Sequence, residues 1–270
     1  MSVGGSNLRA MDFSNSSEFA SKVVYLPEIG STNTELLHLS TTAPDEWPDF
    51  SVLLTDNQIS GRGRLDRSWV ASPGDALAVS VLIRPKTFGI QSFGWLPLLA
   101  GLAMTNCVSS LIEDGSVGLK WPNDVLVNGE KISGLLAEIL PSGDAVVIGA
   151  GLNLRQDKAG LPIPTATSLA LHNVSGFELD DILVRYLASL KRLYEDFSDA
   201  NGDPEASGLL AEVLEKSATV GSKVLVQLPD GTEFSGKAAG LDNDGRLLVA
   251  MSDPIEIRAV AAGDIQHLRQ

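Results

Sequence analysis

Three arginines, two glycines and a tryptophan fall within nine residues of an otherwise acidic chain, at 61–69 (Gly-Arg-Gly-Arg-Leu-Asp-Arg-Ser-Trp). Arginine presents a planar fork of donors that matches the oxygens of a phosphate or a carboxylate. Glycine lets the backbone approach a ligand closely, and the face of Trp69 can stack on a heterocycle. The segment therefore predicts a site for a small anionic ligand that carries a ring, and nucleotides are the obvious class. The alternative is a basic, flexible surface loop.

A second polar group, Ser31-Thr32-Asn33, follows a short apolar strand expected at 23–26. Any one of the three can cap the helix expected after them, because a side-chain oxygen there accepts a hydrogen bond from a free backbone N–H group. The same side chains also offer hydroxyl and amide groups to a ligand. Both roles can coexist.

Covalent catalysis and dinucleotide binding find little support. A nucleophilic Ser or Cys needs a neighbouring base, whereas His38, His172 and His267 are isolated in the sequence and are expected on the surface or in loops. Cys107 falls on the apolar face of a predicted helix, which indicates a structural role. Gly149-x-Gly151 lacks the third glycine and the βαβ setting of a Rossmann fingerprint, and no Gly-Lys-Ser/Thr of a Walker motif occurs.

The elements that must position these residues follow from the hydrophobic pattern. Asn128-Gly129 is a strong hairpin signal with apolar strands on both sides. The strands form an antiparallel meander with helices packed on one side, an α+β layout. Strands are expected at 51–55, 76–84, 125–127, 130–140 and 145–148, and helices at 96–112, 180–197 and 205–216, the last following Pro204 in its first turn.

The pattern changes near Gly221, where five short strands with turn residues every eight to twelve positions begin. Such spacing predicts a small barrel of about fifty residues. Asp242, Asn243 and Asp244 superficially resemble a calcium-binding loop, but no glutamate follows at the twelfth position, so a plain turn is expected.

Composition excludes several classes of function. The chain has 270 residues, a net charge of −14 and a single cysteine. A negative surface argues against general binding to nucleic acid or anionic membranes, and one cysteine excludes an internal disulfide. No run of about eighteen apolar residues occurs, and residues 1–20 are polar and read as a flexible tail with at most a short helical turn. We therefore expect a soluble cytoplasmic protein.

Five motifs occur in one order along the chain. They are Ser31-Thr32-Asn33, Gln58-x-x-Gly61-Arg62-Gly63-Arg64-x-x-Arg67-x-Trp69, Lys120-Trp121-Pro122-Asn123-Asp124, Lys131-x-x-Gly134 and Gly149-x-Gly151-x-Asn153. Their order and spacing, together with the small C-terminal barrel, resemble the biotin–protein ligase family over roughly residues 22–270. The resemblance implies a catalytic domain similar to class II synthetases at 22–218, with a mixed or antiparallel sheet packed with helices, an SH3-like β-barrel at 219–270 and a flexible tail at 1–21.

The resemblance also implies a two-step reaction. Biotin and MgATP give biotinyl-5′-adenylate and pyrophosphate, and a lysine of an acceptor protein then takes the biotinyl group. The residues expected to bind biotin are Ser31, Thr32, Asn33, Gln58, Gly61, Arg62, Gly63, Arg64, Lys120, Gly134 and Gly151. Those expected on the nucleotide side are Arg62, Arg67, Trp69, Asn123, Lys131 and Asn153.

The chemistry of adenylation suits these residue types. Joining a carboxylate to an α-phosphate brings two anions together, and fixed cations such as Lys120, Arg64 and Lys131, with the Mg²⁺ that accompanies ATP, offset that charge. No protein-bound metal is expected. Asp124 is the candidate that orients or deprotonates the acceptor lysine, and a turn role after Asn123 is the alternative.

One departure falls inside the arginine loop, where this chain has Leu65-Asp66 and the family usually has a basic or polar residue followed by glycine. Loop closure or retention of the adenylate could therefore differ. Family members that also repress transcription carry an N-terminal helix-turn-helix domain, and the short polar segment here predicts a ligase without specific DNA binding. The expected partner is the biotin carboxyl carrier domain of an acyl-CoA or pyruvate carboxylase.

Three rival interpretations remain. A lipoate–protein ligase is related in fold and chemistry, but the Gly-Arg-Gly-Arg loop and the terminal barrel favour biotin. A non-catalytic nucleotide- or RNA-binding module conflicts with the acidic charge and the lack of interleaved aromatic residues. A pure interaction protein built on the C-terminal barrel leaves the upstream motifs unexplained.

Overall fold

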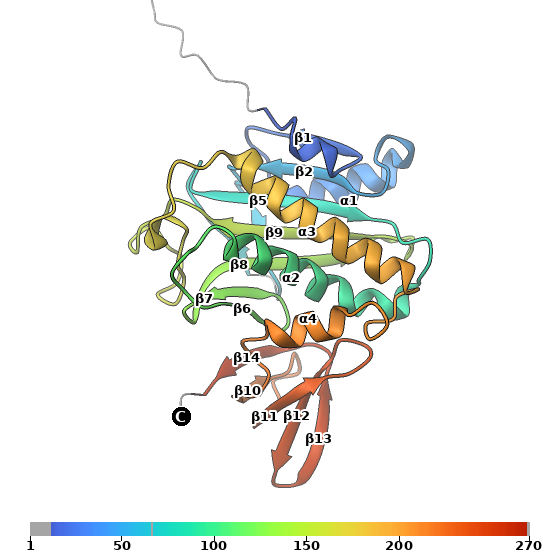
Figure 1. Ribbon diagram of the computed structural model, residues 1–270, viewed down its shortest axis with the longest axis vertical. Helices are drawn as coiled ribbons and strands as arrows, with labels where there is room; N and C mark the ends of the chain where they lie inside the picture. The colour runs from blue at the N-terminus through green and yellow to red at the C-terminus, as the bar shows by residue number, and fades with distance from the viewer. Residues whose placement is uncertain (1–11, 66, 269–270) are drawn as a thin grey trace, which may run out of the picture.

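The computed structural model describes residues 12–65 and 67–268, in a layered catalytic unit with a smaller sheet below it (Figure 1). The larger sheet has seven strands in the order β1-β2-β5-β9-β8-β7-β6. β1 and β2 are parallel, and the other neighbours are antiparallel. The strands are β1 (Lys22–Tyr25), β2 (Ser51–Thr55), β5 (Ala76–Ile83), β6 (Val117–Lys120), β7 (Asp124–Val127), β8 (Glu130–Ile139) and β9 (Val146–Asn153).

The meander forms where the turn residues predict it. Asn128 and Gly129 join β7 to β8 with φ angles of 52° and 84°, as a type I′ hairpin turn requires. The strand pairing continues from β7 through β8 to β9 and β5, with one register shift between β7 and β8 at Val125 and Leu126. The fold class expected from the sequence is confirmed.

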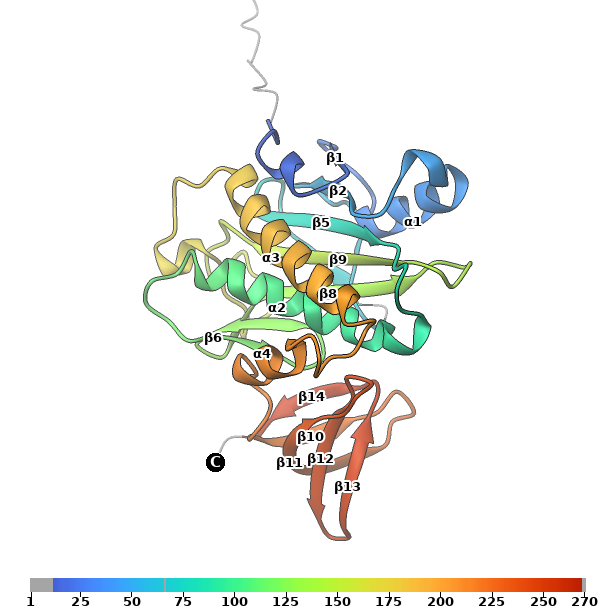
Figure 2. The same cartoon turned by 45° about the vertical axis from the view of Figure 1, so that its right-hand side comes forward.

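Helices cover both faces of the sheet, so the expectation of helices on one side only is wrong. α2 (Leu96–Ser109) and α3 (Leu179–Asp199) lie side by side on one face, whereas α1 (Thr32–Thr42) lies on the other (Figures 1 and 2). Alternation along the strands explains this, because successive side chains point to opposite faces. Val52 and Leu54 join the α2–α3 core, and Leu53 joins Leu36 and Trp47 on the α1 side.

Two sequence predictions about the helices and the tail are corrected. Residues 12–20 are not a free tail, because the backbone N–H groups of Asn15 and Ser16 donate to the Asp180 carboxylate at 3.1 and 3.0 Å, and Phe13 packs on the core. The rest of the predicted tail, residues 1–11, lies outside the described residues. The helix expected at 205–216 begins only at Leu209, as α4 (Leu209–Glu215), so Pro204 is not in its first turn.

The C-terminal sheet has the five predicted strands, all antiparallel. They are β10 (Lys223–Gln227), β11 (Glu233–Leu241), β12 (Leu247–Ser252), β13 (Ile255–Val260) and β14 (Asp264–His267), paired in the order β13-β12-β11-β10-β14. Residues 242–246 form a turn between β11 and β12, as expected, because the Asp242 side chain accepts hydrogen bonds from the backbone N–H groups of Asp244 and Arg246.

This turn and the segment before β10 join the two sheets. The indole N–H groups of Trp95 and Trp121 donate to the carbonyls of Asn243 and Gly245 at 2.7 and 3.0 Å. The turn packs so closely that a Cβ atom on Gly94 would lie 2.5 Å from the carbonyl oxygen of Asp244. The C-terminal sheet therefore lies directly against the Trp121 segment.

The outer edge of β6 pairs with residues 216–218, which lead into the C-terminal sheet. The backbone N–H of Leu119 donates to the carbonyl of Lys216, and Ala218 N–H donates to the carbonyl of Leu119, both at 2.8 Å. Lys120 follows on the same strand. Within the described residues no helix is long and apolar enough to cross a membrane.

Candidate active site

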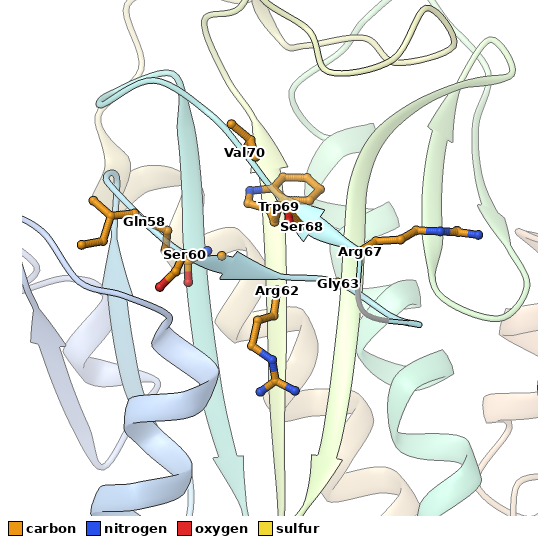
Figure 3. A pocket seen from close by; sticks show the side chains of 10 residues that line it. Gln58, Ser60, Arg62, Gly63, Arg67, Ser68, Trp69 and Val70 are labelled. Atoms are coloured by element: carbon orange, nitrogen blue, oxygen red, sulfur yellow. The ribbon is translucent and has the colours of Figure 1, made fainter.

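The arginine loop is a small hairpin that lies over the sheet. Its strands are β3 (Gly61–Arg62) and β4 (Ser68–Trp69). Gly61 is needed there, because a Cβ atom would lie 2.5 Å from the carbonyl oxygen of Trp69 and 2.7 Å from the Gln58 side chain. Gly63 N–H donates to the carbonyl of Arg67 at 2.7 Å and closes the hairpin. Figure 3 shows Arg62 and Arg67 leaving it in different directions.

Beneath the hairpin the sheet presents a floor of very small side chains. The residues on this face of three adjacent strands are Ala76, Ala78 and Ser80 of β5, Gly149 and Gly151 of β9, and Gly134 of β8. The indole of Trp69 lies on this floor, since a Cβ atom on Gly151 would overlap the ring and one on Gly134 would lie 3.5 Å from it. We call the space between this floor and the hairpin, which the Trp69 indole occupies, the slot. Its small side chains suit a flat, mainly apolar ring.

A polar group closes one end of this slot. Ser31 caps α1, with its side chain 3.5 Å from the Thr34 N–H, and the next two residues face the sheet. Gln58 Oε1 accepts hydrogen bonds from Thr32 N–H and lies 3.1 Å from Thr32 Oγ1. Asn33 is buried and packs where Gly149 leaves room, because a Cβ atom there would overlap its amide. Capping and ligand-facing roles thus coexist in this segment.

The front end of the arginine loop, defined here as Gly61 and Arg62, is held by the catalytic sheet. Arg62 Nη2 donates to Glu138 Oε1 of β8 at 2.9 Å, and Arg62 Nη1 lies 3.3 Å from Thr34 Oγ1. The other carboxylate oxygen of Glu138 accepts from Asn33 Nδ2 at 3.0 Å. Glu138 is not among the site residues predicted from the sequence, although a carboxylate inside the apolar run Leu135-Leu-Ala-Glu-Ile-Leu140 is a usable signal.

The back end of the loop, defined here as Arg64 to Arg67, reaches the C-terminal sheet instead. Arg64 donates to Asn123 Oδ1 at 2.9 Å and to the carbonyl of Gly263 at 3.3 Å. Arg67 forms an ion pair with Asp264, at the start of β14. Burial lowers the pKa of Arg64, while Asp264 and Asp124 oppose that effect. Asp264 is also absent from the predicted site, because nothing in the C-terminal sequence pattern relates it to residue 67. Asp66 lies outside the described residues.

A cluster of cations lies beside the back end. Lys131 Nζ is 2.6 Å from Asp124 Oδ1, and this ion pair is too poorly directed to give that oxygen a hydrogen bond. Burial lowers the pKa of Lys120, Asp124 partly offsets this, and the nearby charge of Lys131 lowers it further. The turn between β6 and β7 brings these three side chains together, since Lys120 and Asp124 pair across it. An anion bound here would restore the charge of Lys120.

The two asparagines predicted on the nucleotide side also have structural contacts. Asn123 Nδ2 donates to the carbonyl of Leu135 at 2.7 Å, which leaves its Oδ1 for Arg64. Asn153 is buried and donates to the carbonyl of Thr167 at 2.9 Å. Asn153 pairs in register with Ala76, so it lies at the end of the floor opposite Ser80.

His267 is not an isolated surface residue. It lies half-buried on β14, 3.2 Å from Thr219 Oγ1, which accepts a hydrogen bond from Trp121 N–H. Burial and the charge of Lys120 lower the pKa of His267. Burial raises the pKa of the Cys107 thiol to about 12, so its structural role is consistent with the sequence prediction.

A hollow of about 300 Å³ opens on the outer side of the hairpin, lined by residues 58–63 and 67–70. It reaches neither Thr32 nor Lys120, and a smaller hollow lies between Trp69 and the alanines of β5. Gln58, Arg62 and Arg67 line the larger hollow, whereas Thr32 and Lys120 do not. Among residues 12–65 and 67–268, no group of three or more His, Cys, Asp or Glu side chains could hold a metal ion.

An arginine loop over a floor of small residues, with a lysine cluster beside it, suits a ligase that joins a carboxylate to a nucleotide phosphate. Comparison with known proteins agrees. Residues 25–153 match the biotin/lipoate A/B protein ligase family, and residues 219–268 match the biotin protein ligase C-terminal domain.

Individual relatives narrow this class. A biotin–[acetyl-CoA-carboxylase] ligase of Mycobacterium tuberculosis is 38% identical over 90% of this chain and 87% of its own length, and one of Paracoccus denitrificans is 30% identical over 83% and 92%. The biotin protein ligase of Aquifex aeolicus, solved in complex with biotin and ATP, superposes with a TM-score of 0.73 at 26% identity, over 92% of this chain and 99% of that one. The chain belongs to the biotin protein ligase family.

Proposed function

We propose that this chain converts biotin and MgATP into biotinyl-5′-adenylate and pyrophosphate, and then transfers the biotinyl group to a lysine of a biotin carboxyl carrier domain of an acyl-CoA or pyruvate carboxylase. The observation that carries the proposal is that Gly134 lies between the indole of Trp69 and Lys131, because a Cβ atom there would be 3.5 Å from the ring and 2.9 Å from Lys131 Nζ. A solved relative that holds biotin and ATP together supports this use of the site. We propose residues 22–218 as the catalytic unit and 219–270 as the C-terminal domain, acting in the cytoplasm, where ATP is supplied.

The biotin rings occupy the slot over the small-residue floor in this proposal. Thr32 and Gln58 present side-chain oxygens at its closed end, next to the cap residue Ser31 and the buried Asn33. Gly134 and Gly151 give the rings room, because neither carries a Cβ atom to fill the slot. Trp69 moves off the floor and covers the ligand, with Gly61 and Gly63 allowing the hairpin to close.

Adenylation places the biotin carboxylate and the α-phosphate beside Lys120. A carboxylate oxygen attacks the α-phosphorus, the P–O bond to the β-phosphate breaks, and pyrophosphate leaves. Lys120, Lys131 and Arg64 stabilise the negative charge that builds on the phosphoryl oxygens. Arg62 lies next to the biotin end, and Arg67, Asn123 and Asn153 line the nucleotide side.

Mg²⁺ suits this site as a companion of ATP rather than as a resident ion. Mg²⁺ in nucleotide sites is held by phosphates, waters and one or two carboxylates, and Asp124 is a carboxylate whose Oδ1 lacks a well-directed hydrogen bond. When bound with ATP, Mg²⁺ offsets phosphate charge. In the second step Asp124 orients the acceptor lysine and takes its proton, the amine nitrogen bonds to the acyl carbon, and AMP leaves.

The proposal is tested by transfer of labelled biotin to a purified carrier domain with ATP and Mg²⁺. Wild type is expected to label the acceptor, and Lys120→Ala to reduce labelling by at least 100-fold, as loss of a charge-stabilising group does. Lys237→Ala is the matched control, because Lys237 is exposed on β11 of the C-terminal sheet. Adenylate formation from lipoate but not from biotin would mean that lipoate is the acid substrate. No adenylate from either acid would overturn the proposal.

A further inference from the structure

The segment that leads into the C-terminal sheet, residues 216–219 and called the linker here, holds the backbone on both sides of Lys120. On one side, both backbone polar groups of Leu119 are hydrogen-bonded to the linker at 2.8 Å. On the other side, the backbone N–H of Trp121 donates to Thr219 Oγ1 at 3.0 Å. The position of Lys120 therefore depends on where the linker holds its two neighbours.

The hydroxyl of Thr219 connects this backbone to the C-terminal sheet. It is fully buried and has one proton to donate. The described part of the chain gives it two polar partners, the N–H group of Trp121 and, at 3.2 Å, Nε2 of His267. Because the backbone N–H can only donate, Thr219 Oγ1 accepts there, and its own proton is left for His267. All three groups are satisfied only when Nε2 carries no proton.

The surroundings of His267 favour this neutral form of the ring. Three elements meet at the half-buried His267 side chain: β10 places the apolar Val224 directly opposite it, the linker supplies Thr219, and β6 contributes the charge of Lys120. Burial and that charge lower the pKa of His267. A proton on Nε2 would add a second cation near Lys120 and leave the Thr219 proton without its acceptor.

We propose that His267 is a positioning residue for adenylation, and that it holds Lys120 in place through Thr219 and the backbone of Trp121. The neutral ring accepts the Thr219 proton, which keeps the Thr219 oxygen turned toward the Trp121 N–H. A protonated ring donates to the same oxygen instead, so Thr219 turns to satisfy its own proton and releases Trp121. The catalytic consequence rests on the proposed function, in which Lys120 meets the carboxylate and the α-phosphate.

The first test compares two substitutions of His267 at neutral pH. His267→Gln keeps an acceptor, because the amide oxygen of glutamine reaches about as far as Nε2, whereas His267→Leu has none. His267→Leu is expected to lower the rate of biotinyl adenylate formation about tenfold, the effect of one lost buried hydrogen bond, and His267→Gln to keep the wild-type rate. The dissociation constant for biotin without ATP is expected to stay the same in both, because the floor comes from β5, β8 and β9.

The pH profile separates this role from simple packing of the ring. In wild type, the rate of adenylate formation is expected to fall about tenfold as the pH drops below 6.5, the ordinary pKa of histidine, because His267 takes up its proton at a still lower pH. His267→Gln cannot be protonated and is expected to lack this fall. Asp124 and His172 are present in both proteins, so the difference between the two profiles reports His267 alone.

Hydrogen exchange at the Trp121 amide tests the same link without any substrate. Exchange is expected to be about tenfold faster in His267→Leu and unchanged in His267→Gln. Thr219→Val should match the leucine variant, and Thr219→Ser, which keeps the hydroxyl, should match wild type. Trp95→Phe is the control, because it removes the hydrogen bond to Asn243 between the same two units and shows how much exchange follows from lost stability alone.

Three results would overturn the assignment. They are wild-type adenylation and exchange in His267→Leu, equal losses in His267→Leu and His267→Gln, and a loss of biotin affinity as large as the loss of rate. Failure of wild type to form any biotinyl adenylate would instead reject the proposed function. The exchange of the Trp121 amide would still decide whether His267 holds this segment.

Discussion

The two ends of the arginine loop are held by different parts of the molecule. At the front end, Arg62 is bound by Glu138 of the catalytic sheet. At the back end, Arg64 and Arg67 are bound by Gly263 and Asp264 of the C-terminal sheet. The two directions are visible in Figure 3. One hairpin of nine residues thus bridges two units that fold from distant parts of the chain.

The charge balance of the two ends differs as well. At the front end one arginine meets one carboxylate, and its side chain is 48% exposed, so the pair is largely neutral and weak. Among the described residues, the back-end cations Lys120, Lys131, Arg64 and Arg67 lie near two carboxylates, those of Asp124 and Asp264. The excess of positive charge at the back end suits phosphates, whereas the neutral front end suits an uncharged ring. We therefore propose that the back end binds the nucleotide phosphates and that the front end recognises the ring.

The largest expected effect separates these assignments directly. Arg64→Met is expected to lower the rate of biotinyl adenylate formation about 100-fold, because it removes a fixed charge near the α-phosphate. Arg62→Met is expected to raise the KM for biotin about tenfold and to leave the rate at saturation almost unchanged. Pyrophosphate release measured against each substrate distinguishes the two patterns. Equal effects of both variants on both substrates would mean that the loop acts as one unit.

A second experiment tests whether the C-terminal sheet acts on the back end through position or only through stability. Trp121→Phe and Trp95→Phe each remove one indole hydrogen bond to the same turn, at Gly245 and Asn243. Both are expected to lose about 1 kcal/mol of stability. Only Trp121→Phe is expected to slow adenylation, by about tenfold, since Trp121 follows Lys120 directly. The melting temperature and the adenylation rate are measured for both variants. Equal slowing of adenylation in both would mean that the Trp121 hydrogen bond contributes only to stability.

The sequence predicted side chains at both ends of the loop, and it missed one carboxylate at each, Glu138 and Asp264. The Asn128-Gly129 turn and the alternating strands predicted the meander, and the motif order placed Thr32, Gln58 and Gly151 in one site. These features are local, because each depends on a periodicity or a turn that a few neighbouring residues determine. Glu138 was within reach of the same reasoning, as a charge in an apolar strand.

The back end depended on contacts that no local pattern encodes. Asp264 and Arg67 are 197 residues apart, and they meet because tertiary contacts, among them the indole hydrogen bonds of Trp95 and Trp121, hold the C-terminal sheet against the larger unit. The same limit explains the N-terminal residues 12–20, which Asp180 holds through tertiary hydrogen bonds. Tertiary contacts of this kind override local propensity. The later start of α4 has a local cause, because Asp203 Oδ1 accepts from the N–H groups of Glu205 and Ala206, and Gly208 before the helix has a φ angle of 77°.

The pH dependence of activity tests the role of Lys120, which lies beside the back end. Lys120 has a lowered pKa, chiefly through burial, so it loses its charge at a lower pH than an ordinary lysine. The value of kcat/KM for ATP is therefore expected to fall as pH rises, below the pH range in which an exposed lysine titrates. Bound ATP raises this pKa, so the fall in kcat should lie at higher pH.

The same lowered pKa makes the stability of the folded protein change with pH in the opposite direction to its activity. The folded state disfavours the charged form of Lys120, so this group costs stability at neutral pH and costs less as pH rises through its folded pKa. Lys120→Met is thus expected to raise the melting temperature of the ligand-free protein at pH 7 and to reduce its rise toward alkaline pH. A Lys120→Arg variant whose alkaline limb in kcat/KM stays in place would show that another group controls the rate.

The smallest effect concerns the boundary between the two ends. Leu65 has a φ angle of 52°, in the left-handed region that disfavours side chains with a Cβ atom, and it is 53% exposed. Leu65→Gly removes about 1 kcal/mol of strain but adds flexibility to the unfolded chain that offsets part of it. We expect a gain of at most about 2 °C in melting temperature and faster release of the adenylate by a few fold, because a flexible boundary uncouples the front end from the back end.

Asn201→Gly is the control, since Asn201 has a φ angle of 54° and asparagine tolerates this region better than leucine. An unchanged rate of adenylate release from Leu65→Gly would mean that Arg62 and Arg64 hold the ligand independently of each other.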